Sequence, residues 1–470
     1  MAEPSCPGCI ERDAVIAALL ERVATLEARV RELEGQLGKN ASNSSVPPSA
    51  NPPGAPKPVV KKRSGKRPGG QRGHPGHSRL CLPPERVNRV IPLVPTQCDR
   101  CAAPLPASPS ARDPEPTRHQ FAELPRVAAL VTEFQGHARS CPGCGHVTHE
   151  AIPAALRAHA FGPRLAAALS YLSGCPYASK RGLAAVVEDL FGLPISLGTV
   201  AALQQQTSQA LQPAHQEIAR VVQQAEVKHV DETGWKQAGQ KRWLWVAVTA
   251  TAALFVVHLR RSAAALKALL GEVVTGLVCS DRWSAYSLIP VERRQLCWAH
   301  LKRDFQAMAE RGGEAGQVGE ELSAYARILF RLWHKVRDGT RKRPWLARKV
   351  EAWLRPEVQA LLARGAACGC AETEGTCADI LKLEPALWTF VRAEGLEPTN
   401  NAAERALRPA VLWRKRSFGC HSAEGCRFVE RLLSVVQTLR LQQRPVLDYL
   451  TEAVVAHRHT LPIPKLLPIG

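Results

Sequence analysis

The amino-acid sequence changes its hydrophobic period at Glu226, and this change constrains the fold more than any other feature. Before it, apolar residues recur at helical spacing. After it, they form short runs bounded by turn residues, which predict strands. Three such runs are followed by a helix-like run and then a fourth strand-like run, so we expect an α/β domain. The expected strands cover residues 227–231, 242–248, 254–259 and 276–281, and the expected helix covers residues 262–273.

The first and the fourth of these strands end in the aspartates Asp231 and Asp281. Three antiparallel strands, a helix and a further strand are the opening of an RNase H-like fold, in which both carboxylates would emerge at adjacent strand ends. A third acid, Glu404, lies in the first turns of a late helix that Thr399 or Asn400 can cap. Carboxylate oxygens select Mg²⁺ or Mn²⁺. Two such ions would support an in-line phosphoryl displacement by a water or a 3′-hydroxyl.

The net charge of +20 implies a polyanionic partner, with nucleic acid as the first candidate and an acidic membrane surface as the second. The chain contains no apolar run of the roughly 20 residues that a membrane span needs. It also lacks the pattern of a signal peptide. We therefore expect a cytoplasmic, nucleoid-associated protein. Glu232 is not expected to bind metal, because neighbours in a strand point to opposite faces. The basic residues around the third acid that are candidate DNA contacts are Arg405, Arg408, Arg414, Lys415 and Arg416.

A heptad repeat of apolar residues runs from Ile16 to Leu37. Mostly β-branched residues at one core position and leucine at the other favour a parallel two-stranded coiled coil. The charges of Arg22 and Glu27 suit pairing between two such helices. We expect a homo-oligomer, at least a dimer, formed through this segment. The alternative is a single amphipathic helix that packs on its own domain.

The segment after the heptads, residues 38–79, is polar and proline-rich and then becomes basic. It has too few apolar residues to bury a core, so we expect it to be disordered when free. A basic arm of this kind can follow DNA phosphates or enter the minor groove. The alternative is a solvated linker. The candidate DNA contacts in it are Lys61, Lys62, Arg63, Lys66 and Arg67.

Two Cys-x-x-Cys pairs follow, Cys98 with Cys101 and Cys141 with Cys144. Four thiolates suit a tetrahedral structural Zn²⁺, and paired cysteines in a reducing compartment indicate metal binding rather than disulfides. We expect a zinc ribbon with an inserted hairpin, part of which the strand-like run 128–134 could form. The alternatives are coincidental pairs, or a nearby histidine in place of one thiolate.

Residues 163–211 indicate two or more helices broken at Gly192, with Ser196 as the N-cap of the later helix. Such a pair of helices could be a helix-turn-helix whose second helix enters a major groove. An ordinary helical hairpin is the alternative. Further on, residues 320–364 are helical and basic. Their tryptophans, which could stack on bases or fill a helical core, are Trp333, Trp345 and Trp353.

In their order along the chain, these features resemble the transposases of the insertion-sequence-66 family. The resemblance rests on the N-terminal zipper, the Ser-Ser and Pro-Pro-Ser tract, the two cysteine pairs and the three acid motifs. It implies cleavage and transfer of DNA strands at inverted-repeat ends without a covalent protein–DNA intermediate. It also implies a helical insertion between the second and third acids, and accessory transposition proteins. Cys297 and His300 fit the family's CxxH, and we expect them to support the active centre rather than to act as catalytic ligands.

Two alternatives to a transposase remain open. One is a non-catalytic DNA-binding regulator, and the other is an RNase H-like nuclease that cuts without joining. The predicted domains are a coiled coil (10–38), a disordered basic linker (39–90), a zinc-binding domain (91–152), a helical region with a possible helix-turn-helix (160–222), the first part of the catalytic core (225–310), the helical insertion (311–395), the second part of the core (396–455) and a tail (456–470).

Overall fold

A computed structural model of the 470-residue chain provides the structure. The chain divides into two compact units, Met1–Pro56 with Ala129–Gly470, and Lys57–Ala128. Within the described residues no helix is both long enough and apolar enough to cross a membrane. Most of the regular structure is helical, and the main sheet is mixed. The structure describes residues 7–37, 44–45, 81–108, 110–111, 113–125, 127–174 and 178–466.

Helix α1 (Pro7–Leu37) includes the whole predicted heptad segment. Its apolar heptad side chains are exposed, including Leu19 at 57%, Val23 at 49% and Leu26 at 58%. A contiguous apolar stripe left in water indicates a surface that a partner covers. The alternative that this helix packs its stripe on its own domain therefore has no support in the described chain. The basic arm with Lys61, Lys62, Arg63, Lys66 and Arg67 lies outside the described residues.

The region of the cysteine pairs contains little regular structure. Strands β1 (Ala138–Ser140) and β2 (Val147–His149) form an antiparallel hairpin around the second cysteine pair. The expectation that residues 128–134 form a hairpin strand is wrong, because that run has no strand and its Leu130 is 96% exposed. A strand needs a partner for its backbone groups, and none of the described segments pairs with this run. A short 3₁₀ turn, η2, covers Pro84–Arg86.

Among the helices that precede the sheet, the predicted break at Gly192 and the predicted N-cap at Ser196 are confirmed. Helix α4 ends at Gly192, whose φ of 67° is left-handed, and Ser196 caps α5 by accepting a hydrogen bond from the Thr199 N–H at 3.1 Å. Helix α5 contacts α3, α4, α15 and α16, so much of its surface is buried. The five helices are α2 (Ala154–Arg157), α3 (Pro163–Gly174), α4 (Lys180–Phe191), α5 (Leu197–Ala210) and α6 (Gln212–Gln224).

A five-stranded sheet follows, with the strand order β5-β4-β3-β6-β7. Strands β3, β4 and β5 are antiparallel neighbours, whereas β6 and β7 run parallel to β3. Ala238 and Gly239 join β3 to β4 with positive φ of 48° and 77°, the turn geometry that matches strand twist. The predicted succession of strands and helix is confirmed, and β7 was not predicted. The expected end of the first strand at Asp231 is wrong, because residues 231–237 continue to pair with β4. The elements are β3 (Val227–Gln237), β4 (Gln240–Val248), β5 (Ala253–His258), α7 (Ala263–Leu270), β6 (Leu277–Ser280) and β7 (Arg294–Leu296).

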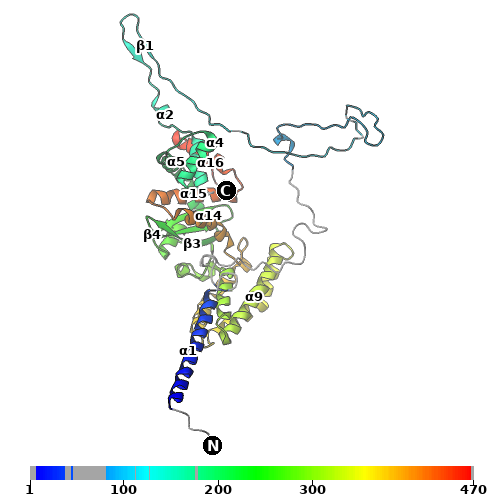
Figure 1. Ribbon diagram of the computed structural model, residues 1–470, viewed down its shortest axis with the longest axis vertical. Coiled ribbons are helices and arrows are strands. Elements are labelled where there is room, and N and C mark those ends of the chain that lie inside the picture. Colours follow the sequence, from blue (N-terminus) through cyan, green and yellow to red (C-terminus); the bar gives the residue numbers. More distant parts are fainter. Residues whose placement is uncertain are drawn as a thin grey trace. The chain divides into compact units, whose positions relative to one another are not determined.

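Both faces of the sheet are covered. All five residues of Leu244–Val248 in β4 are buried, and successive side chains in a strand point to opposite faces. Helix α7 packs on β4 and β5, α14 (Asn401–Ser417) on β3 and β4, and α15 (Ala423–Leu441) on β5. Two helices near the end of the chain thus lie against strands that begin at Val227 (Figure 1).

Helix α15 also satisfies the backbone of the edge strand β5. Alternate N–H groups of β5 donate to side chains one helical turn apart on α15. Two strand residues advance by about 6.6 Å and four helix residues by about 6 Å, so the two spacings match. Covering an edge in this way removes a site for unwanted pairing. The bonds run from Ala253 to Thr438 Oγ1 (3.0 Å), from Phe255 to Ser434 Oγ (2.8 Å) and from Val257 to Glu430 Oε1 (2.6 Å).

Between β7 and α14 the chain forms helices with a hydrophobic core of their own. Trp333 is buried there against Phe390, with ring centroids 5.5 Å apart, whereas Trp353 is 42% exposed. Of the two roles considered for these tryptophans, stacking on bases or filling a helical core, Trp333 therefore has the second. The helices are α8 (Trp298–Ala309), α9 (Gly313–Arg337), α10 (Arg343–Lys349), α11 (Arg355–Gly365), α12 (Ala371–Lys382) and α13 (Thr389–Arg392). The short helical segments η5 (Val350–Leu354) and η6 (Glu384–Leu387) lie among them, whereas η3 (Ser284–Leu288) and η4 (Val291–Arg293) precede β7. Helix α16 (Val446–Arg458) ends the fold.

Candidate active site

Asp231 lies within β3, and Asp281 directly follows β6, the strand that runs parallel to β3. His229 of β3 pairs with Cys279 of β6, and each aspartate follows two residues further along its chain. Because parallel strands advance in step and residues two apart share a face, the two carboxylates lie side by side. Each accepts one backbone N–H: Glu232 donates to Asp231 Oδ1 and Trp283 to Asp281 Oδ1, both at 2.9 Å.

Glu404 reaches these acids because the start of α14 is fastened to β3. The side-chain amide of Asn400 donates to the carbonyl of Val230 at 2.7 Å, and its backbone N–H donates to Cys297 Sγ at 3.2 Å. Val230 immediately precedes Asp231, so the tether sets α14 against the acid-bearing strand. Asn400 occupies the N-cap position but makes no side-chain cap bond. The predicted cap is therefore wrong, since the amide is used to bind β3.

The three acids interact electrostatically. Burial raises the pKa of Asp231 well above its ordinary value, and the negative charges of Glu232, Asp281 and Glu404 raise it further. A carboxylate in this situation is costly to ionise without a cation. The cluster therefore has the charge that a divalent ion would neutralise.

The three acids lie further apart than the ligands of one small ion, whose oxygen atoms are about 2.0–2.1 Å from the metal. Ligand atoms from three residues that all lie within 4.8 Å of one another occur in the described chain only at Cys297, His300 and Glu404. Asp231, Asp281 and Glu404 are therefore more widely spaced than that group.

Glu232 lies beside the three acids, and its carboxylate is bound by two other side chains. Its side chain is only 1% exposed, and it accepts hydrogen bonds from Arg261 Nε and Tyr286 Oη, both at 2.5 Å. Arg261 also lies 3.6 Å from Asp281 and stacks over Trp283. That Glu232 does not bind metal stays a prediction, since Arg261 joins its carboxylate to that of Asp281. The sequence reasoning missed Arg261, which follows β5 and meets Asp281 only through the folding of the chain.

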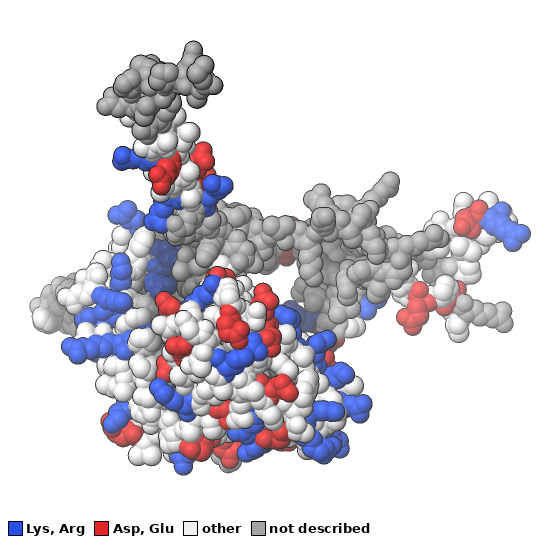
Figure 2. Space-filling model, turned by 90° about the horizontal axis from the view of Figure 1, so that it is seen from below, with Lys and Arg blue, Asp and Glu red and all other residues white. Residues whose placement is uncertain are grey.

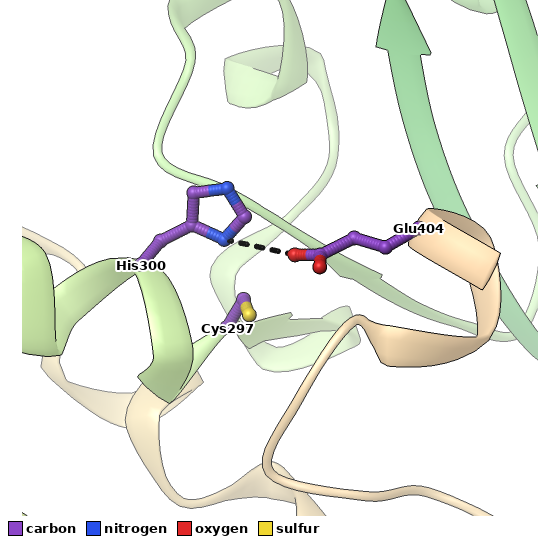
Figure 3. Close-up of side chains that lie close together, drawn as sticks. All are labelled: Cys297, His300 and Glu404. Atoms are coloured by element: carbon purple, nitrogen blue, oxygen red, sulfur yellow. Dashed lines mark ion pairs between the residues drawn. The ribbon is translucent and has the colours of Figure 1, made fainter. Parts of the chain in front are cut away.

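Cys297 and His300 lie against Glu404 (Figure 3). Cys297 is buried at the N-cap of α8, and His300 is one turn further along. The His300 Nδ1 atom is 3.9 Å from Glu404 Oε1. Burial raises the pKa of Cys297 to about 11, and backbone N–H groups of Asn400, His300 and Ala299 act against that increase. Both residues thus lie next to the third acid, and their supporting role stays a prediction.

The basic residues predicted to contact DNA near Glu404 divide into two groups. Arg414 donates to Thr233 Oγ1 at 3.1 Å and to the carbonyl of Gly234, so it ties α14 to β3. The remaining side chains are exposed. On the face seen in Figure 2, lysines and arginines are interspersed with aspartates and glutamates, so a DNA surface has to be argued from particular residues. The exposed ones on α14 are Arg405, Arg408, Lys415 and Arg416.

The two Cys-x-x-Cys turns share one backbone pattern. In each, the first cysteine donates its N–H to the carbonyl five residues later, and the residue four positions later donates its N–H back to the carbonyl of that cysteine. That fourth residue has a positive φ, 57° at Ala102 and 73° at Gly145. The same turn therefore occurs twice, although one copy does so without glycine.

Each turn directs backbone N–H groups at its first sulfur. These hydrogen bonds, from the residues two and three positions further on, lower the pKa of Cys98 and of Cys141. A stabilised thiolate is the form that binds zinc. Cys98 and Cys101 belong to one compact unit and Cys141 and Cys144 to the other, so a site shared by all four stays a prediction.

Comparisons with known proteins identify two matching families. The model of the Transposase IS66 family matches residues 159–427, more than half of the chain. A second model, described as a Family of unknown function (DUF6444), matches residues 3–80. The Uncharacterized protein y4qI of Sinorhizobium fredii (strain NBRC 101917 / NGR234) is 25% identical over 193 residues, which are 38% of this chain and 35% of that protein. The chain thus matches about a third of the length of this curated relative.

Proposed function

Because the chain belongs to the Transposase IS66 family, we propose that it is a DDE transposase that cleaves DNA at the terminal inverted repeats of an insertion sequence and joins the ends to a target. Asp231, Asp281 and Glu404 would together hold two Mg²⁺ or Mn²⁺ ions. The observation that carries this is the convergence of three carboxylates from β3, the end of β6 and the start of α14. Burial raises the pKa of Asp231, and the charges of Glu232, Asp281 and Glu404 raise it further. Such a protein acts where its DNA is, at the nucleoid.

We assign the sheet and its helices to an RNase H-like domain. The support is the strand order β5-β4-β3-β6-β7, with three antiparallel strands and then two strands parallel to the first. Helix α7 lies between the third and fourth strands in sequence, as the assignment requires. The helices α8–α13 between β7 and α14 are then the insertion that separates the second acid from the third.

The residues of the chain divide the work of the site. When bound, a pair of divalent ions activates a water or a 3′-hydroxyl and stabilises the departing oxygen. Asp231, Asp281 and Glu404 supply hard oxygen ligands for those ions. Arg261 holds Asp281 and the buried Glu232 in place. The exposed cations of α14, with Arg405 and Arg408 nearest to Glu404 in sequence, would bind the DNA phosphates.

The N-terminal part would bring DNA and a second subunit. We propose that α1 forms a parallel coiled coil, that the basic residues 61–67 contact phosphates, and that Cys98, Cys101, Cys141 and Cys144 bind one structural Zn²⁺. The matching turns of the two cysteine pairs support the zinc site. The burial of α5 by four other helices disfavours its use as a major-groove reader, and we assign it to the helical core.

The cleavage step is tested with the purified full chain and a DNA duplex carrying the element's end. Asp231→Asn, Asp281→Asn and Glu404→Gln should each reduce Mg²⁺-dependent cleavage by at least about 10²-fold, the cost of removing a group that stabilises transition-state charge. Glu452→Gln, the same change at an exposed position of α16, is the matched control. Undiminished cleavage in the three variants would refute the metal site, and a wild type that never cleaves would favour a regulator.

Strand transfer is tested separately. Pre-cleaved element ends and a target plasmid are incubated with the wild-type chain and Mg²⁺, and joined products are counted by sequencing across the junctions. Joining with target duplications of one fixed length supports a transposase. Cleavage without any joined product would instead favour the RNase H-like nuclease.

A further inference from the structure

The side chains of Cys297, His300 and Glu404 converge on one point from two helices (Figure 3). One potential ligand atom from each lies within 4.8 Å of the other two, and His300 Nδ1 is 3.9 Å from Glu404 Oε1. Around a tetrahedral zinc ion, with bonds of about 2.0–2.3 Å, neighbouring ligand atoms are roughly 3.3–3.8 Å apart. Small side-chain rotations would therefore close the group around a single ion.

The kinds of donor distinguish this group from the acid cluster. A thiolate and an imidazole are ligands that Zn²⁺ and Co²⁺ accept, and that Mg²⁺ does not favour. Cys297 and His300 are three residues apart at the start of α8, so their side chains can meet on one face of the helix. The group offers three protein ligands and leaves a fourth position for water.

Two features of the group indicate that it is built for a ligand. The Nδ1 atom of His300 is shielded from solvent and has no hydrogen-bond partner, an arrangement that folded proteins rarely leave without a reason. The sulfur of Cys297 receives N–H groups from Ala299, His300 and Asn400. Cys297 thus accepts N–H groups from the residues two and three positions later in the chain, as Cys98 and Cys141 do.

We propose that Cys297, His300 and Glu404 bind one zinc-class ion, at a site separate from that of the catalytic Mg²⁺ ions. The thiol of Cys297 loses its proton to solvent when the ion binds. Glu404 belongs to both sites, so an ion held by Cys297 and His300 draws its carboxylate away from Asp231 and Asp281. The ion would then inhibit DNA cleavage. This last consequence rests on the proposed function, whereas the binding site itself does not.

The test of binding uses the full chain, stripped of metal and re-equilibrated with Zn²⁺. Metal content per chain is measured by atomic emission for the wild type, Cys297→Ser and His300→Ala. Cys368→Ser in the insertion is the matched control, and circular dichroism verifies folding. His300 is 28% exposed, so its replacement is the milder of the two. We expect the wild type and the control to hold one ion more than either variant. Equal metal content in all folded proteins would overturn the site.

Binding of Co²⁺ gives a second, spectroscopic test of the same site. Thiolate–Co²⁺ absorption is recorded for the wild type minus Cys297→Ser. A difference band that titrates to one equivalent supports the site, and a flat difference spectrum refutes it. The affinity for this equivalent should fall by about tenfold or more in His300→Ala, because even outer-shell partners contribute that much to metal binding.

Inhibition is measured as the ratio of each protein's own cleavage rates with and without Zn²⁺ at fixed Mg²⁺. Zn²⁺ should lower the cleavage rate of the wild type by about tenfold or more, and it should lower the rate of Cys297→Ser by a smaller factor. An equal fall in both would refute the inhibitory role. A wild type that binds the extra ion but never cleaves DNA in Mg²⁺ would refute the proposed function and leave the zinc site standing.

Discussion

Asp231 shows how one residue of the site opposes the stability of the fold. Its carboxylate is half-buried and has three acidic neighbours, Glu232, Asp281 and Glu404, which together with burial raise its pKa. In the absence of metal the folded chain must either protonate this group or bear its charge. The cluster thus lowers the stability of the folded chain unless a proton or a cation neutralises it.

Replacing this charge should stabilise the metal-free protein. The folded pKa of Asp231 lies above the ordinary value of 3.8, so the penalty is absent below about pH 3.8 and grows as the pH rises towards the folded pKa. Asp231→Asn should therefore raise the free energy of unfolding by about 1–2 kcal/mol at pH 7 in EDTA. The gain should vanish near pH 3.5. Denaturant unfolding at both pH values measures it, and an equal gain at both would contradict this origin.

Arg261 supplies the positive charge beside these acids. It neutralises Glu232, whose side chain is 1% exposed, and lies 3.6 Å from Asp281. Arg261→Ala would leave a buried carboxylate with only Tyr286 as its partner. We expect a loss of about 2–4 kcal/mol in the free energy of unfolding. Arg260→Ala, at the exposed neighbouring position, should change it by less than about 0.5 kcal/mol. Similar losses in the two variants would show that the pairing is unimportant.

At the scale of elements, the fit of α15 along β5 is the contact that most depends on matched spacing. Three side chains of the helix satisfy three N–H groups of an edge strand. One of them is Glu430, and burial raises the pKa of its carboxyl group to about 7. Its amide analogue keeps the acceptor and removes the charge.

Glu430→Gln should therefore make stability less dependent on pH. The folded pKa of about 7 exceeds the ordinary value of 4.5, so the wild type loses stability as the pH rises from about 4.5 to 7, and the loss is complete above that. The variant should be more stable by about 1–3 kcal/mol at pH 8 and equal to the wild type at pH 4. Thermal unfolding across this range measures the difference. A constant offset at every pH would argue against titration of Glu430.

At the scale of the whole molecule, α1 carries an apolar stripe that the described chain does not cover. We expect a parallel dimer through this helix. Replacing both Val23 and Leu26 with serine should dissociate it, whereas serine at Ala24 and Ala28, on other faces of the same helix, should not. Light scattering gives the mass in each case. A wild type that is already monomeric, or equal masses for both double variants, would exclude the coiled coil.

Much of the site could be predicted because its parts are local. Asp231 and Asp281 each follow a short apolar run in the sequence, and Glu404 lies at the start of a helix, so each acid has a recognisable context along the chain. Arg261 and the Asn400 tether could not be predicted in the same way. Arg261 lies beyond the end of β5 in an unremarkable turn, and the amide of Asn400 has an equally good use as a helix cap.

The sequence by itself determined the order of strands and helices and the family resemblance, and it pointed to the three acids proposed for the site, because hydrophobic period and short motifs depend on neighbours in the chain. Only the tertiary structure decided what those acids touch. It brought Cys297 and His300 to Glu404, used Arg414 to fasten α14 to β3 and paired α15 with the edge of β5. These contacts join segments separated by up to about 180 residues, so they depend on how the packed sheet and helices are stacked, which a local pattern does not encode.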